Sequence, residues 1–228
     1  AYMMMSKLHE LATELEGDFF TDETIRTLYA TDASAYREMP LAVAIPASVN
    51  DIKKLIAFAN EQKTSLIPRT AGTSLAGQVV GNGIVVDVSK KFTQILELNT
   101  EERWVRVQPG VIRDELNLFL KPHGFLFGPE TSTANRAMMG GMVGNNSCGS
   151  NSIVYRSTRE HLLEVKALLS DGSEAVFKAL DPDTFHAKCE ESTLEGNIYK
   201  NIRSLLGNYD NQQEIRKEFP KKRIERRN

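Results

Sequence analysis

Cysteine is scarce in this sequence. The 228 residues contain two, Cys148 and Cys189, and neither belongs to a CxxC pair. Disulfide frameworks and structural zinc sites require more cysteines at closer spacing. The sequence therefore predicts neither a disulfide framework nor a bound metal.

Long apolar runs are missing as well. The chain opens Ala1-Tyr2-Met3-Met4-Met5 and turns polar at once. A signal peptide or a membrane helix would need a much longer apolar segment. We therefore expect no signal peptide and no stable membrane insertion, and we expect the protein to be cytoplasmic.

Neither sign of charge is in large excess. Twenty-eight Lys and Arg stand against thirty Asp and Glu, a formal net charge of −2. This balance gives no reason to expect a nucleic-acid partner. One segment differs, because residues 216–227 hold seven basic and two acidic residues. We interpret it as a solvated chain end; a contact with RNA, acidic lipid or an acidic protein partner is the alternative.

Recognisable catalytic sets are also missing. The four histidines are His9, His123, His161 and His186, and none has metal-ligand companions. We interpret His123, which precedes Gly124, as a helix end, and His161 as a structural residue at the start of a strand. No carboxylate pair and no Ser/His/Asp set can be identified, so the sequence assigns no catalytic residue.

Hydrophobic residues make up 41% of the chain, enough for a sizeable core. Apolar residues from Leu8 to Leu15 have helical spacing, and Gly17 is placed as a C-terminal cap. Later come apolar strands and a helix that Ser48 caps. The strands are expected at 41–46, 65–68 and 83–89. Strands that alternate with a helix indicate a small, mostly parallel sheet.

The pattern changes after residue 91. Alternating strands at 93–99 and 103–110, and a hairpin at 162–177 with Asp171-Gly172 at its turn, predict a larger, mostly antiparallel sheet. The predicted fold class is therefore α+β, with two α/β subdomains. We expect a helical cover over 1–39, a first subdomain over 40–91, and a second over 92–228 that ends in helices.

Two segments rich in glycine stand out. The first is PRTAGTSLAGQ, residues 68–78. Small residues let the backbone approach a ligand closely, and consecutive N–H groups can form a concave site for an anion such as pyrophosphate. Gly72 and Gly77 fit the GxxxxG of a Walker A motif, but Gln78 stands where that motif requires lysine, so we exclude it.

The second segment is GGMVGNNSCGSNS, residues 140–152, preceded by GPETSTA at 128–134. It combines small residues with amides and hydroxyls. Its spacing does not match the GxGxxG of a dinucleotide-binding βαβ unit, so a doubly wound NAD domain is not predicted. Either segment, taken alone, could equally be an ordinary turn.

Four ordered stretches carry a resemblance to a known family. They are IPASVNDIKKLIAFANEQKTSLIPRTAGTSLAGQ, VRVQPGVIRDELN, GPETSTANRAMMGGMVGNNSCGS and STREHLLEVKALLSDG. Over about residues 40–178 the sequence resembles the FAD-binding domain of FAD-linked oxidases, the PCMH-type fold shared with vanillyl-alcohol oxidase. Within that family it is most similar to D-lactate, glycolate and D-2-hydroxyglutarate dehydrogenases. The tail FPKKRIERRN resembles large bacterial members that are fused to an iron–sulfur module.

The resemblance implies that FAD lies between the two subdomains. The first segment would surround the FAD pyrophosphate, and the second would follow the ribityl chain and flavin. The residues implied in cofactor binding are Arg69, Thr70, Ala71, Gly72, Thr73, Ser74, Gln78, Pro129, Glu130, Thr131, Ser132, Thr133, Gly140, Gly141, Asn145, Asn146, Ser147 and Gly149.

The sequence departs from its relatives in two places. The first segment reads Thr70-Ala71-Gly72, without the histidine that anchors flavin covalently in some relatives, so we expect non-covalent FAD. Cys148 does not stand where a tethering cysteine would, and we interpret it as an inert thiol. Arg156 stands where relatives commonly have glycine.

These implications give a functional hypothesis. We expect the FAD-binding part of a dehydrogenase or oxidase that transfers a hydride from a small D-2-hydroxy acid to FAD. The alternatives are a flavin- or nucleotide-binding module without catalysis, and a protein-interaction domain. We expect a substrate domain, and any iron–sulfur cluster, to lie outside a truncated chain that retains FAD weakly and does not turn over alone. The electron acceptor stays unassigned.

Overall fold

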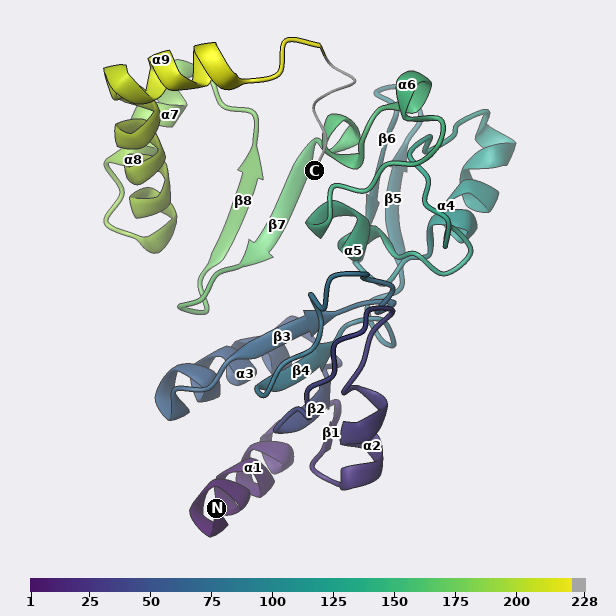
Figure 1. The fold of residues 1–228 in the computed structure, drawn as a ribbon, viewed down its shortest axis with the longest axis vertical. Helices are drawn as coiled ribbons and strands as arrows, with labels where there is room; N and C mark the ends of the chain where they lie inside the picture. The colour runs from purple at the N-terminus through teal and green to yellow at the C-terminus, as the bar shows by residue number, and fades with distance from the viewer. Residues whose placement is uncertain (223–228) are drawn as a thin grey trace. The chain divides into compact units, whose positions relative to one another are not determined.

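The computed structural model describes residues 1–222. The chain divides into two compact units, one over Ala1–Glu160 and one that begins at His161 (Figure 1). The predicted boundaries at 39/40 and 91/92 stay predictions. Residues 223–228, which hold part of the basic C-terminal segment, lie outside the described residues.

The first part of the larger unit is built around a four-stranded sheet of order β1-β2-β4-β3. Strands β2, β4 and β3 run parallel, and β1 joins the edge antiparallel to β2. The elements are α1 (Tyr2–Glu14), β1 (Asp18–Phe20), α2 (Glu23–Leu28), β2 (Ala42–Ile45), α3 (Val49–Gln62), β3 (Leu66–Arg69) and β4 (Ile84–Asp87). The mostly parallel sheet that the sequence predicts is therefore confirmed.

One face of this sheet holds the core of this part. Leu8 of α1 and Leu55 of α3 pack on Ala44 and Ile84, and all four are fully buried. Helix α3 begins where the sequence predicts, because the Ser48 hydroxyl accepts a hydrogen bond from the amide of Asp51. These two helices hold the strands in place, and so fix the point at which each strand ends.

Gly17 is not the helix cap that the sequence predicts. Helix α1 ends at Glu14, and Leu15 leaves it in an extended conformation. Gly17 is required by close packing, since a Cβ there would lie 2.1 Å from the carbonyl oxygen of Ile45. Its amide donates to the buried carboxylate of Asp51 at 2.9 Å. A contact with a residue 34 positions away leaves no local signal in the sequence.

The rest of the larger unit has a second core. An antiparallel strand pair packs with two helices around Leu116 and Met142, which are buried. The elements are β5 (Ile95–Asn99), β6 (Trp104–Val107), α4 (Arg113–Leu120), the 3-10 turn η1 (Lys121–His123), α5 (Met139–Gly144), α6 (Ser152–Tyr155) and the 3-10 turn η2 (Thr158–His161). His123 ends a helical segment as predicted, and Gly124 follows in the left-handed conformation.

The second unit contains the predicted hairpin and three helices. Its elements are β7 (Glu164–Leu168), β8 (Glu174–Lys178), α7 (Pro182–Cys189), α8 (Leu194–Gly207) and α9 (Tyr209–Glu218). The hairpin turns through Gly172, whose φ of 83° suits glycine. The described strands after residue 91 form two separate antiparallel pairs, β5-β6 and β7-β8, rather than the one larger sheet that the sequence predicts. The α+β class is confirmed.

Candidate functional site

The first glycine-rich segment leaves β3 at the carboxyl end of the parallel strands and forms the first part of the connection to β4 (Figure 1). Gly72 and Gly77 both have φ of 71°, a conformation that other residues adopt only with strain. The loop is braced from within, because the Ser74 hydroxyl donates to Gln78 Oε1 at 2.6 Å and accepts from the Ala76 amide at 3.3 Å. It is therefore a shaped connection rather than a spacer.

The Arg69 side chain packs against this loop at Gly72. A Cβ on Gly72 would lie 2.4 Å from Arg69 Nη2, so the guanidinium occupies the space that a side chain there would need. Arg69 Nη1 donates to the carbonyl of Thr31 at 2.8 Å, and the guanidinium lies 5.2 Å from the centre of the Tyr29 ring. Arg69 is thus engaged by the protein itself, and its predicted contact with a cofactor stays a prediction.

The stretch that leads into the second segment is held by helix α4. Arg113 Nε donates to the carbonyl of Pro129 at 3.1 Å. Asn117 bonds both backbone groups of Phe127: its Nδ2 donates to the carbonyl at 3.1 Å, and its Oδ1 accepts from the amide at 2.8 Å. We did not identify either residue from the sequence. Their four-residue spacing, which places both on one helix face, was the available signal.

Glu130 carries the only acidic side chain among the predicted cofactor-binding residues. Its Oε1 accepts hydrogen bonds from Asn151 Nδ2 at 2.7 Å and from Ser150 Oγ at 3.2 Å. Gly149 lies against it, since a Cβ there would be 2.5 Å from Glu130 Cγ. The carboxylate therefore joins the start of the second segment to its end. Nearby, the hydroxyls of Thr131 and Thr133 lie 3.3 Å apart.

Part of the second segment forms a helix rather than a loop. Helix α5 contains Gly140 and Gly141, and it begins where the Gly140 amide donates to the carbonyl of Pro109 at 2.9 Å. A Cβ on Gly141 would lie 2.7 Å from the hydroxyl oxygen of Thr70. The two glycine-rich segments, far apart in the sequence, therefore meet where the first leaves β3.

In α5 and directly after it, the predicted residues divide into two kinds. Asn146 and Ser147 hold the backbone: Asn146 Oδ1 accepts from the Arg159 amide at 2.9 Å, and the buried Ser147 carbonyl accepts from the Thr158 hydroxyl at 2.7 Å. Gly141 and Asn145 are exposed. They are four residues apart, so they share one side of α5 with the Thr70 contact. That exposed side is the part of the segment available to a ligand.

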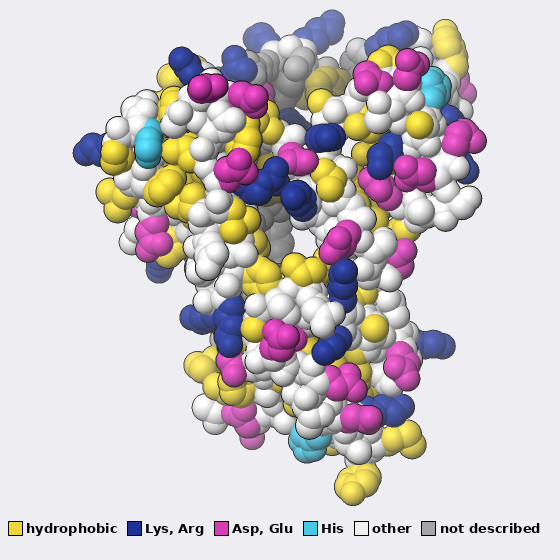
Figure 2. Space-filling view, turned by 180° about the vertical axis from the view of Figure 1, so that it is seen from behind, with side chains coloured by type: hydrophobic (Ala, Val, Ile, Leu, Met, Phe, Trp, Pro, Cys, Tyr) yellow, Lys and Arg dark blue, Asp and Glu magenta, His cyan; other side chains and the backbone are white. Residues whose placement is uncertain are grey.

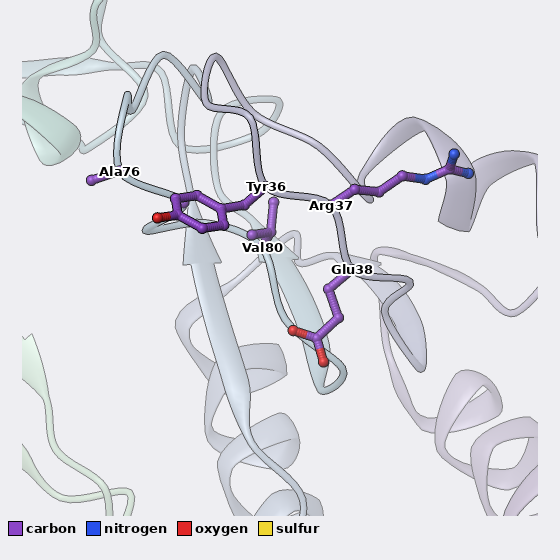
Figure 3. A pocket seen from close by; sticks show the side chains of 6 residues that line it. Tyr36, Arg37, Glu38, Ala76 and Val80 are labelled. Carbon is purple, nitrogen blue, oxygen red and sulfur yellow. The ribbon is translucent and has the colours of Figure 1, made fainter.

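A shallow pocket of about 270 Å³ lies beside the first loop (Figure 3). It is lined by Tyr36, Arg37, Glu38, Ala76, Gly77 and Val80. The Tyr36 ring fills the space above Gly77, where a Cβ would be 2.7 Å from its Cδ2. The side chain of Arg37 points away from the loop (Figure 3). Neither Thr70 nor Gly141 lines this pocket.

The histidines of the chain lie in helical segments. His9 lies in α1, His123 in η1 and His186 in α7. Over residues 1–222, no cluster of His, Cys, Asp and Glu could hold a metal ion. None of the helices in this range combines the length and the hydrophobicity that crossing a bilayer requires. In Figure 2, basic and acidic side chains are interspersed over the visible face of the described residues.

Comparison with known proteins agrees with this geometry. A family of sequences described as "FAD binding domain" matches residues 40–177. D-2-hydroxyglutarate dehydrogenase of Haemophilus influenzae is 47% identical over 160 residues, which are 69% of this chain and 16% of that protein. The enzyme of the same name from Pseudomonas putida is 39% identical over 192 residues, 83% of this chain and 19% of that protein.

The fold agrees as well. The wild-type BBE-like 1 protein of Physcomitrella patens superposes with a TM-score of 0.65 at 19% identity, covering 77% of this chain and 38% of that one. The chain thus spans less than a fifth of the length of these two dehydrogenases. The fold and the cofactor class that the sequence resemblance implies are both confirmed by these matches.

Proposed function

The chain belongs to the FAD binding domain family, and on that premise we propose that it is the FAD-binding part of an enzyme that oxidises a small D-2-hydroxy acid. The observation that carries the proposal is the meeting of the two glycine-rich segments at Thr70 and Gly141. The dehydrogenases with 47% and 39% identity support the choice of reaction.

The residues present suit a phosphate-bearing cofactor. The first loop has no acidic side chain between Pro68 and Gln78, and the Arg69 guanidinium fills the space that a Cβ on Gly72 would need. Backbone amides and small hydroxyls in such a loop can surround an anion. The one carboxylate of the proposed set, Glu130, is already occupied by Asn151 and Ser150. The loop proposed to hold the phosphates thus contributes no carboxylate of its own.

We assign the cofactor contacts to the predicted residues in two groups. Residues 70–74 and Gln78 would hold the pyrophosphate, and residues 129–133, 140–141, Asn145 and Gly149 would follow the ribityl chain and flavin. Asn146 and Ser147 would hold the backbone between them in place. Arg69 acts from beneath Gly72, without needing to touch the cofactor. When bound, FAD supplies a flavin ring that accepts the hydride. The chain's own residues bind and orient it.

The FAD would be held without a covalent bond. The first loop contains neither histidine nor cysteine. Cys148 lies between Ser147, which is buried, and Gly149, which packs on Glu130. Cys148 itself is a free, partly buried thiol.

The substrate class follows from the relatives. We propose a D-2-hydroxy acid of the D-lactate, glycolate or D-2-hydroxyglutarate type. The groups that bind its carboxylate and accept its hydroxyl proton would belong to a substrate domain in the larger share of the relatives' length that this chain does not span. An iron–sulfur cluster would also lie outside these 228 residues, because they contain two cysteines.

A matched pair of glycine variants tests the proposal. Gly72→Ala and Gly124→Ala place a side chain at nearly the same positive φ, 71° and 76°, and each should lower stability by about 1 to 2 kcal/mol. Only Gly72→Ala also displaces Arg69, because nothing lies within 4 Å of a Cβ on Gly124. We expect Gly72→Ala to weaken FAD binding at least about tenfold, and Gly124→Ala to bind FAD as the wild type does.

Calorimetry with FAD, together with urea unfolding, measures both effects. Equal FAD affinity in the two folded variants would refute the assignment of the first loop. If wild-type binding showed no preference for FAD over AMP, a nucleotide-binding module without flavin chemistry would replace the proposed function.

A further inference from the structure

Tyr29 links the N-terminal segment to both strands that flank the first loop. Its hydroxyl donates to Oδ2 of Asp87, at the end of β4. Its ring lies under the guanidinium of Arg69, at the end of β3, with 5.2 Å between the Arg69 Cζ atom and the ring centre. Tyr29 precedes the region that matches the family, which begins at residue 40.

Arg69 and Asp87 are direct partners in the parallel pairing of β3 with β4. Asp87 is 2% exposed, and a buried carboxylate is strongly attracted to a cation this near in the sheet. Yet both groups have other partners. The Asp87 carboxylate accepts from the Tyr29 hydroxyl and, at 2.8 Å, from the Ser89 amide. Arg69 Nη1 donates to the carbonyl of Thr31.

The Tyr29 hydroxyl therefore gives the Asp87 carboxylate a hydrogen-bond donor, while the Tyr29 ring packs against the Arg69 guanidinium. Burial raises the pKa of Tyr29 above its ordinary value, and the hydrogen bond and charge of Asp87 raise it further. The hydroxyl remains a donor at physiological pH. With Asp87 satisfied, the Arg69 guanidinium stays beneath Gly72, at the position where a Cβ would lie 2.4 Å from Nη2.

We propose that Tyr29 is a positioning residue for the cofactor. By donating a hydrogen bond to the Asp87 carboxylate, it keeps the Arg69 guanidinium next to Gly72 and so sets the conformation of the first loop. This inference rests on the proposed function. It adds the segment from Tyr29 to Thr31 to the cofactor site, although these residues need not touch FAD. Without the hydroxyl, Arg69 turns toward the unsatisfied carboxylate and leaves the loop without support.

Tyr29→Phe tests the inference because it keeps the ring and removes the donor. We expect its FAD affinity to fall about tenfold, the effect of one lost hydrogen bond to a buried charged group. Tyr209→Phe is the control, since Tyr209 is 71% exposed at the start of α9. It should bind FAD with wild-type affinity.

The double variant Tyr29→Phe/Asp87→Asn separates positioning from general damage. Neutralising Asp87 removes the attraction on Arg69, so FAD affinity should return to within about threefold of wild type. Without cofactor, the amides of residues 70–78 should exchange hydrogen faster in Tyr29→Phe than in the wild type. In the double variant their exchange rates should return to those of the wild type. This second measurement does not depend on FAD binding.

Three results would overturn the inference. They are unchanged FAD affinity in Tyr29→Phe, a double variant that binds no better than the single one, and loop exchange that is equal in all forms. If the wild type itself does not bind FAD, the proposed function is wrong. The loop-positioning role is then decided by hydrogen exchange alone, and exchange in Tyr29→Phe equal to that of the wild type would refute it.

Discussion

Arg156 holds a backbone conformation that only glycine adopts without strain. Its φ is 64° and its ψ is −158°, at the C-terminus of α6. Within residues 1–222 the side chain makes one loose ion pair, with 3.9 Å between Nε and Glu160 Oε2. Such a pair at the surface contributes little stability. Glycine would therefore suit this position better than arginine does.

We predict that Arg156→Gly raises the free energy of unfolding by about 1 kcal/mol. This net gain is the backbone strain that glycine relieves, minus the cost of the greater flexibility of glycine in the unfolded chain. Arg156→Ala is the matched control, because it removes the same ion pair but keeps a Cβ in the strained conformation. It should give no increase. Urea unfolding measures both, and equal stabilisation of the two variants would contradict the strain explanation.

The packing of Arg69 against Gly72 could not be predicted from the sequence. The sequence correctly indicated that Gly72 needs backbone freedom, because small residues in a turn are a local signal. It could not show that the Arg69 guanidinium fills the space beside Gly72 and bonds Thr31, 38 residues earlier. The role of a long, flexible side chain depends on what folding brings near it.

At the scale of elements, one buried carboxylate joins the end of α1 to the start of α3. Asp51 is fully buried in the first turn of α3 and accepts hydrogen bonds of 2.9 Å from the amides of Glu16, Gly17 and Ala47. Burial alone would raise the pKa of Asp51, but the three amides, with the nearby Lys54 ammonium, outweigh it and hold the pKa below its ordinary value.

This arrangement predicts an acid-sensitive fold. A carboxyl group whose pKa is lower in the folded than in the unfolded state contributes stability above its unfolded pKa of about 3.9, and that contribution is lost as the pH falls below it. Asp51→Asn should lower the free energy of unfolding at pH 7 by about 1 to 3 kcal/mol. The variant should also lose less stability than the wild type between pH 5 and pH 3. Parallel pH profiles from urea unfolding would contradict this account.

Helix α5 offers a test of the contact between the two segments. Gly141 and Gly144 belong to the same helix, but a Cβ on Gly141 would lie 2.7 Å from the Thr70 hydroxyl, and one on Gly144 would meet nothing within 4 Å. Gly144→Ala should therefore raise stability by about 0.5 to 1 kcal/mol, the usual gain in helix propensity, without changing FAD affinity.

Gly141→Ala gains the same propensity but pushes Thr70 away. We expect it to weaken FAD binding about tenfold relative to Gly144→Ala, as measured by flavin fluorescence on titration. If both variants bound FAD equally, the contact between Thr70 and Gly141 would have no part in the cofactor site.

The elements themselves were largely predictable, for a physical reason. Strands β2, β3 and β4 are short apolar runs bounded by breakers, and Ser48 caps α3 through a bond three residues away. Both signals are local. Helix α5 was expected as a loop because four of its six residues are glycine or valine, which favour helix weakly. It forms because Met139 and Met142 are buried in the core that it shares with α4.

At the scale of the whole molecule, the family match runs from residue 40 to residue 177 and so includes both units partly. The residues proposed to bind FAD all belong to the larger unit, Ala1–Glu160. The sequence resemblance gave the fold and the cofactor class, because four motifs in order are far more specific than one loop. It could not give the role that we propose for Tyr29 and Thr31, which precede the matched region.

The central claim, that these 228 residues form an FAD site, is tested most directly by titrating the flavin-free wild-type chain with FAD and following flavin fluorescence. We predict saturation at one FAD per chain, and release of all the flavin when the complex is denatured in acid, because no histidine or cysteine of the first loop can bond to it. A fluorescence signal that never saturates, or flavin that stays with the denatured protein, would contradict the account.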